Sequence, residues 1–218
     1  MAAFVEFAGT GLLYAAYAGL PLLLLPLAVL IAPKVFSLVA KPLSDVLDRI
    51  SGIAMGFSVS AAFLIILIQL SAVLMRYVFG LSFSWLNDSV IFSFAMIFML
   101  GAAATLRDDG HVRVDILRSR FGPRTRAAIE LFGAVAFIFP IGILILYAGS
   151  GLIERTWLDL EPFNESDGLP IKFLFKTLVP LFAILMIGQG LSQALKAALT
   201  VRGLSPPEAL EHGHGGSV

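Results

Sequence analysis

The chain has 218 residues, of which 58% are hydrophobic and 14% are charged, and its mean hydropathy is +0.92. Soluble domains carry roughly 25% charged residues, so this composition excludes an ordinary soluble domain and indicates an integral membrane protein. The 15 Lys and Arg balance the 15 Asp and Glu, which gives no reason to expect a nucleic-acid partner, and the absence of cysteine excludes disulfides, thiolate metal sites and cysteine nucleophiles.

Five apolar stretches are each long enough to cross a membrane, which takes about 20 apolar residues. The first contains Pro21 and Pro26, which predict a kink, and it is either a full crossing or a kinked, tilted helix. The sequence ahead of it lacks the Lys or Arg of a cleaved signal peptide, so we expect none. The stretches cover residues 11–32, 53–78, 85–106, 129–153 and 173–199. The sequence therefore predicts an all-α integral membrane protein with about five transmembrane helices.

The Lys and Arg residues predict the orientation of these helices. With the N-terminus outside, eleven of the fifteen fall in segments on the inner side of the membrane and four on the outer side. This is the asymmetry of multi-pass membrane proteins. The loop 154–170 would then lie outside, and it is acidic. We expect the N-terminus outside and the C-terminus in the cytoplasm.

Arg76 and Asp88 lie at the facing ends of the second and third stretches, which a short turn joins. The turn brings these ends together, so the two side chains either form an ion pair near the outer interface or each extend to water. Trp85, at the start of the third stretch, is typical of the aromatic residues found at membrane interfaces.

Gln69 and Gln189 are polar side chains within the apolar stretches. Each can hydrogen-bond a neighbouring helix, and helix packing is the simpler interpretation of both. A chain that carried an ion or an anion by itself would be expected to show broken helices and buried carboxylates near the membrane midplane. We therefore do not expect this chain to form the transport pathway.

The run LRDDGHVRVDIL, residues 106–117, concentrates charge between two apolar stretches. Val112, Ile116 and Leu117 fall on one helical face and Arg113 adds positive charge, which fits a short amphipathic helix at the cytoplasmic face that contacts anionic membrane lipid. Alternatively its aspartates pair with nearby arginines and fix the shape of the loop. The run lacks a nucleophile and a pocket, so we do not expect an enzyme.

The other histidines, His212 and His214, lie in a Pro- and Gly-rich tail, where a solvated segment is a simpler interpretation than a metal site. No histidine lies within an apolar stretch, which argues against a haem ligated at membrane depth. We expect no metal and no cofactor.

Several short motifs together resemble the small membrane subunit of tripartite ATP-independent periplasmic (TRAP) transporters over about residues 48–199. They are Arg-Tyr-Val-Phe at 76–79, a Trp at 85 with an acidic residue at 88, Leu-Gly-Ala-Ala at 100–103 and Gly-His-Val-Arg-Val-Asp at 110–115. WLNDS at 85–89, Gly-Leu-Pro at 168–170, a lysine at 172 or 176, Pro180 and Gln-Gly-Leu at 189–191 resemble the branch labelled mannitol/chloroaromatic compound transport. The family usually has Glu where this chain has Asp88, and its small subunit usually has four spans.

The resemblance implies a division of labour among three proteins. A periplasmic binding protein captures an organic acid, and a large membrane subunit of the bacterial inner membrane moves it inward by a sodium-driven elevator motion. The small subunit scaffolds the large one, and we expect Arg76, Trp85, Asp88, Gln69 and Gln189 to serve that assembly. The segment with His111, Arg113 and Asp115 would act as a cytoplasmic arm.

The domain organisation that follows has three parts. Residues 1–50 form an additional transmembrane helix and a cytoplasmic linker, residues 51–200 the four-helix domain of the family, and residues 201–218 a disordered tail. Two other functions stay open from the residues: a carrier that works alone, and a membrane enzyme or redox subunit. The lack of histidine and cysteine at membrane depth argues against the second.

Overall fold

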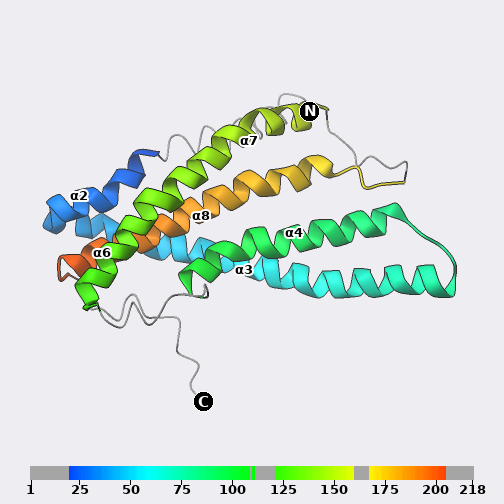
Figure 1. The fold of residues 1–218 in the computed structure, drawn as a ribbon, viewed down its shortest axis with the longest axis horizontal. Coiled ribbons are helices and arrows are strands. Elements are labelled where there is room, and N and C mark those ends of the chain that lie inside the picture. The colour runs from blue at the N-terminus through cyan, green and yellow to red at the C-terminus, as the bar shows by residue number, and fades with distance from the viewer. Residues whose placement is uncertain (1–19, 109, 111–120, 160–166, 205–218) are drawn as a thin grey trace, which may run out of the picture.

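The structure is a computed structural model, and it describes residues 20–108, 110, 121–159 and 167–204 (Figure 1). Every regular element in this part of the chain is helical, which confirms the all-α prediction. The elements are the 3₁₀ helix η1 (Leu20–Leu24), α2 (Leu25–Ile31), α3 (Pro33–Val78), α4 (Ser84–Arg107), α6 (Pro123–Gly133), the π-helix η2 (Ala134–Ile138), α7 (Phe139–Asp159) and α8 (Lys172–Val201).

Four helical runs in the described part are long and apolar enough to cross a membrane. They are α3, α4, the continuous run of α6, η2 and α7, and α8, and they correspond to the second to fifth predicted spans. The chain is therefore a multi-pass membrane protein. Of the first predicted span, the structure describes η1 and the seven-residue α2, which are too short to cross on their own; residues 11–19 lie outside the described part.

Helix α3 is much longer than the span predicted for it, with 46 residues that begin at Pro33. The segment predicted as a linker after the first span is thus helical and continuous with α3. Small residues explain this, because they recur at helical spacings of three, four or seven and form one buried face. The buried residues of α3 are Ala40, Ser44, Ser51, Ala54, Ser58 and Ala61.

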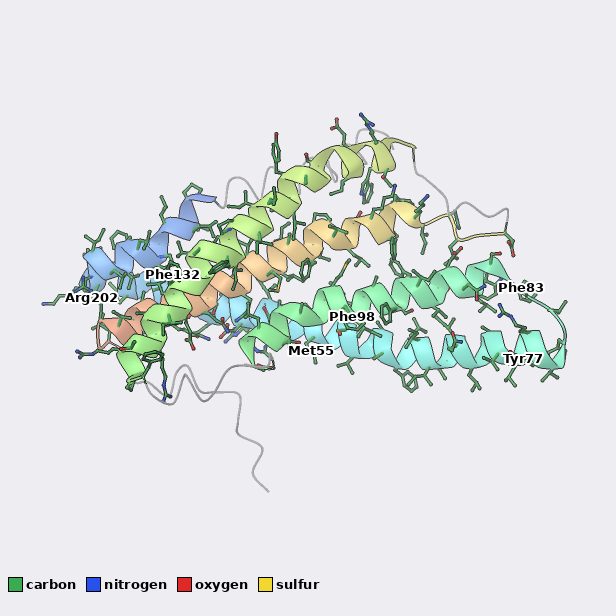
Figure 2. All side chains as sticks on the ribbon, in the orientation of Figure 1. Met55, Tyr77, Phe83, Phe98, Phe132 and Arg202 are labelled. Atoms are coloured by element: carbon green, nitrogen blue, oxygen red, sulfur yellow. The ribbon has the colours of Figure 1, made fainter. Side chains whose placement is uncertain are left out.

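Helix α8 lies at the centre of the bundle and contacts α2, α3, α4, α6 and α7. Figure 1 shows α8 between α7 on one side and the α3–α4 hairpin on the other. Figure 2 places Tyr77 and Phe83 near the turn that joins α3 and α4, and Arg202 at the opposite end of the bundle. We call these the turn end and the Arg202 end.

Small residues allow the helices to approach closely along the middle of the bundle. A Cβ atom at Gly142 on α7 would lie 2.4 Å from the Ile187 side chain on α8, and one at Gly101 on α4 would lie 2.9 Å from Ser58 Oγ on α3. Lipid tails are as apolar as the helices, so close van der Waals packing of this kind holds membrane helices together.

Candidate functional site

Three helices meet in a cluster of polar side chains, which we call the polar junction. It consists of Asp48 and Ser51 from α3, Arg107 from α4, and Gln189, Ser192, Gln193 and Lys196 from α8. On α8 the residues at 189, 192 and 196 follow helical spacing and share one face. That face meets the face of α3 on which Ser44, Asp48 and Ser51 follow the same kind of spacing.

The carboxylate of Asp48 is the centre of the junction. Its Oδ1 accepts hydrogen bonds from Gln189 Nε2 at 3.0 Å and from Ser192 Oγ at 2.6 Å, and its Oδ2 forms an ion pair with Lys196 Nζ. The Asp48 and Lys196 side chains are 23% and 24% exposed. Ser51 Oγ donates to Gln189 Oε1 at 2.6 Å, so the amide that binds Asp48 is itself oriented from α3.

Helix α4 joins the junction through its last residues. Arg107 Nη1 donates to the backbone carbonyl of Asp48 at 3.0 Å, and the same guanidinium binds Asp108 through two hydrogen bonds of 2.7 and 3.0 Å. Gly52 leaves room for this side chain, because a Cβ there would lie 3.1 Å from Arg107 Nη1. Gln193 of α8 donates to the carbonyl of Leu106, one of the carbonyls that the end of a helix leaves without an intrahelical partner.

This arrangement is suited to holding helices in place. Both carboxylate oxygens of Asp48 are engaged by α8 side chains. Within the described residues no buried side-chain polar atom lacks a hydrogen-bond partner, and no three His, Asp or Glu side chains gather as a metal site. A fully satisfied polar network of this kind fixes one arrangement of the helices around it.

The turn end carries a second set of polar contacts. Asp167 Oδ2 accepts from the backbone N–H of Ser84 at 2.9 Å, and Asp88 Oδ2 accepts from the backbone N–H of Leu169 at 3.0 Å. The start of α4 and the segment ahead of α8 thus each provide a carboxylate that accepts a hydrogen bond from the backbone of the other. The hydrogen bond from the Ser84 N–H, followed by one from its hydroxyl, holds the pKa of the Asp167 carboxyl below its usual range.

Helices α7 and α8 are joined at the same end. Trp157 Nε1 donates to Thr177 Oγ1 at 2.8 Å, and Lys176 Nζ donates to Thr156 Oγ1 at 3.1 Å. The ring of Trp157 also meets Phe173 edge-on, with ring centroids 5.1 Å apart. These contacts fix the turn end of α7 against α8.

The predicted ion pair between Arg76 and Asp88 is wrong for this structure. Asp88 lies a full turn into α4 and accepts from Leu169, while the exposed Arg76 approaches Ser82 Oγ at 3.5 Å. For Arg76 the structure therefore agrees with the other interpretation, an arginine that extends outward. Trp85 is 43% exposed at the start of α4, beside the ring of Phe83, as an interfacial aromatic residue would be.

The two glutamines behave differently. Gln189 is 1% exposed and makes the expected hydrogen bonds to a neighbouring helix. Gln69 is exposed on α3 and bonds to no residue in the described ranges, so the expected contact with another helix of this chain is not seen there. His111, Arg113 and Asp115, like His212 and His214, lie outside the described residues, and the cytoplasmic arm stays a prediction.

Sequence reasoning missed six of the seven members of the junction, all except Gln189: Asp48, Ser51, Arg107, Ser192, Gln193 and Lys196. A signal for them was present on α8, where polar residues follow Gln189 at the third and seventh positions within an apolar helix. The complementary signal on α3 is the recurrence of Ser44, Asp48 and Ser51.

The chain matches the family model described as tripartite ATP-independent periplasmic transporters, DctQ component, over residues 65–200, which is more than half of its length. It is 29% identical over 108 residues to the C4-dicarboxylate TRAP transporter small permease protein DctQ of Vibrio cholerae serotype O1. That alignment covers 47% of this chain and 46% of the relative, so the chain spans about half the length of the curated relative it matches. No solved structure matches.

Proposed function

The chain belongs to the DctQ component family of TRAP transporters, the small permease subunits, and we propose that in such a transporter it scaffolds a larger membrane subunit. The larger subunit would move an organic acid inward by a sodium-driven elevator motion, after a periplasmic binding protein delivers it. The chain would have no enzymatic activity of its own. It would lie in the bacterial inner membrane with its N-terminus in the periplasm and its C-terminus in the cytoplasm.

Two observations bear on the substrate class. The relative from Vibrio cholerae is named for C4-dicarboxylates, which supports an organic acid. The motifs WLNDS at 85–89 and Gly-Leu-Pro at 168–170 favour the mannitol/chloroaromatic branch. We place the choice of substrate in the binding protein and the large subunit, because Asp48 and its partners on α8 are engaged with one another.

The exposed face of α3 is the observation that carries the scaffold proposal. Only 11% of the apolar stretch of α3 is buried within this chain, against 33%, 28% and 39% for the other three spans. On this face Gln69 presents an amide that bonds to no residue in the described part of the chain. An amide left without a hydrogen-bond partner in lipid costs several kcal/mol. A transmembrane segment of the large subunit that supplies a hydrogen-bonding group would remove this cost.

The assembly can be tested because the chain has no cysteine, so that single cysteines report one position each. We would introduce Gln69→Cys and, as a matched control, Leu64→Cys, which is 48% exposed on another side of α3. Both would be expressed with the rest of the transporter and treated with a short bifunctional maleimide in native membranes. We expect position 69 to cross-link to the large subunit, identified by mass spectrometry, more strongly than position 64. Equal cross-linking, or a product of twice the mass of this chain, would contradict the proposed face.

Transport itself requires a separate experiment. The chain would be purified gently from native membranes, and it and any stoichiometric membrane partner would be reconstituted into proteoliposomes with a sodium gradient and the binding protein. We expect uptake only when both membrane proteins are present. Uptake by this chain alone would establish an independent carrier instead, and a folded, monodisperse chain that purifies without a partner would also overturn the scaffold proposal.

A further inference from the structure

The charged residues of the four spans mark two levels along the bundle. Each span contains an uncharged run that is bounded by a charged residue at both ends: residues 50–75 in α3, 89–106 in α4, 131–153 in the α6–α7 run and 177–195 in α8. At the Arg202 end, the bounding residues of α4 and α8, Arg107 and Lys196, meet in the polar junction at Asp48, which directly precedes the bounding Arg49 of α3. The junction therefore lies at one boundary of the apolar slab.

Helix α3 continues well beyond this boundary. Its uncharged run spans about 39 Å at 1.5 Å per residue, which already exceeds the roughly 30 Å hydrocarbon core of a bilayer. The whole helix has 46 residues and a length of about 69 Å, whereas a bilayer with its headgroups is about 40–45 Å thick. A helix of this length cannot stand upright within the membrane, and a long helix accommodates such a mismatch by tilting.

Beyond the boundary, α3 has two exposed sides, which we call its flanks. One flank is apolar, with Val35, Val39, Val46 and Ile50 exposed by 65%, 53%, 51% and 45%. The neighbouring flank holds the exposed charged residues, which at similar helical spacing are Lys34, Lys41, Asp45 and Arg49, with the apolar Leu38, 78% exposed, among them. The third side, with Ala40, Ser44 and Ser51, is buried. Apolar and basic surfaces therefore lie side by side on one helix.

We propose that this part of α3, residues 33–50, lies obliquely in the headgroup region of the inner leaflet and binds anionic lipid. Its apolar flank would contact acyl chains, while Lys34, Lys41 and Arg49 would contact the headgroups. Apolar and charged surfaces lie on adjacent sides of the same helix, as they do in helices that lie at a membrane interface. The flank has three basic residues against one acidic residue, which is complementary to an anionic leaflet.

Helix α2 supports lipid as the occupant of this surface. It packs against α3 and α8 and contains no charged residue, and its side chains Leu27 and Ile31 are 39% and 82% exposed. A helix pair that projected into water would leave this apolar surface hydrated, which is unfavourable in proportion to its area. The proposal does not rest on the transport function, because the lipid contact follows from the surfaces of α3 and α2, but its assignment to the inner leaflet rests on the orientation proposed above.

Spin labels on single cysteines in the full-length, otherwise cysteine-free chain test the placement of the two flanks. We would label Val39→Cys and Val46→Cys on the apolar flank, and Lys41→Cys and Asp45→Cys on the charged flank, in nanodiscs of phosphatidylcholine and phosphatidylglycerol. We expect oxygen, which concentrates in lipid, to relax the first pair, and a water-soluble nickel chelate to relax the second. Access of the nickel chelate to all four positions would show a projection into water. Low access of both reagents at 39 and 46 would show protein covering this flank. Either result would overturn the proposal.

The lipid headgroup is tested by charge changes of opposite sign on one flank. Phosphatidylglycerol should raise the melting temperature of the full chain relative to nanodiscs of phosphatidylcholine alone. We expect the double variant Lys34→Gln and Lys41→Gln to lose most of this rise, and Asp45→Asn to enlarge it. An equal rise in melting temperature for the wild type, the double variant and Asp45→Asn would contradict binding of anionic lipid by this flank.

Discussion

Three side chains of α8 bind Asp48 at once, and this number of partners matters more for the stability of the junction than the ion pair alone. A partly buried pair loses much of its Coulomb energy to desolvation, so its net contribution depends on the additional hydrogen bonds that complete it. Here Gln189 and Ser192 supply those bonds to Oδ1, and Lys196 pairs with Oδ2. A shift of α8 by one residue would rotate these side chains by about 100° away from Asp48. The junction therefore specifies the register of α8 against α3.

The coupling between Asp48 and Lys196 can be measured with a double-mutant cycle. Lys196→Met removes the ion pair but leaves the two hydrogen bonds to Oδ1, so we expect the free energy of unfolding to fall by about 1–3 kcal/mol. Asp48→Asn and the double variant complete the cycle, and residues in contact typically couple by about 0.5–3 kcal/mol. Unfolding by denaturing detergent gives the four values, with the exposed Lys41→Met as control. Additive effects of the two substitutions would show that the pair does not act as a unit.

The contact between Asp167 and Ser84 should make the turn end sensitive to acid. The pKa of Asp167 is lowered in the folded protein, so its stabilising effect is fully present above the unfolded carboxyl pKa of about 3.9 and is lost as the pH falls through the folded value. We expect Asp167→Asn to lower the melting temperature at pH 7 and the difference from wild type to shrink below about pH 4. The carboxyl is fully exposed, so the shift should be small. A difference that stays constant from pH 7 to pH 3 would exclude an ionised carboxylate as its source.

The polar residues show how far single positions can be predicted from sequence. Gln189 is conspicuous because it interrupts an apolar run, and a hydrogen bond to another helix is the natural expectation. Asp48 is not conspicuous, because it lies in a segment with other charged residues and only the tertiary structure shows which of them faces α8. The pairing expected for Asp88 failed for a similar reason: its partner, Leu169, comes from a segment far along the chain.

At the scale of helices, close approach depends on glycine at a few positions, and α7 offers a matched pair for testing this. A side chain at Gly142 would collide with Ile187 of α8, whereas Gly151 faces open space. We expect Gly142→Leu to lower the free energy of unfolding by about 1–3 kcal/mol through overpacking. Gly151→Leu should leave it unchanged or raise it by up to about 1 kcal/mol, because leucine favours helix more than glycine does. Similar values for the two variants in detergent unfolding would show that α7 and α8 are not packed this closely.

The four spans were predictable, because an uncharged apolar run of about 20 residues in a membrane protein is typical of a transmembrane helix. The extension of α3 towards Pro33 was not, since Lys34, Lys41, Pro42 and Asp45 are residues typical of a connecting segment. Pro33 lies in the first turn, where proline is tolerated, whereas Pro42 lies nine residues later, inside the helix, where it cannot donate a backbone hydrogen bond. The buried face of small residues provides the packing that continues the helix past Pro42. The π-helical turn η2 between α6 and α7 is a further feature that apolar periodicity does not reveal.

At the scale of the whole molecule, the polar contacts gather at the two ends of the bundle and the small residues lie between them. The polar junction joins α3, α4 and α8 near the Arg202 end, while the contacts of Asp167, Asp88 and Trp157 join α4, α7 and α8 at the turn end. Helix α3 takes part in the first set but leaves most of its apolar length uncovered. A bundle fixed at both ends with one long exposed helix is suited to present that helix as a rigid surface to a partner.

The orientation that we propose for this surface in the membrane rests on the distribution of charge, and it can be tested at both ends of the bundle. Because eleven of fifteen Lys and Arg lie on the side assigned to the cytoplasm, we expect the turn end to face the periplasm. Leu81 and Leu204 are exposed at opposite ends of the bundle, by 49% and 41%. In intact spheroplasts a membrane-impermeant maleimide should label Leu81→Cys at once and Leu204→Cys only after lysis. The reverse labelling pattern would show that the chain has the opposite orientation in the membrane. The proposed lipid contact of residues 33–50 would then belong to the outer leaflet.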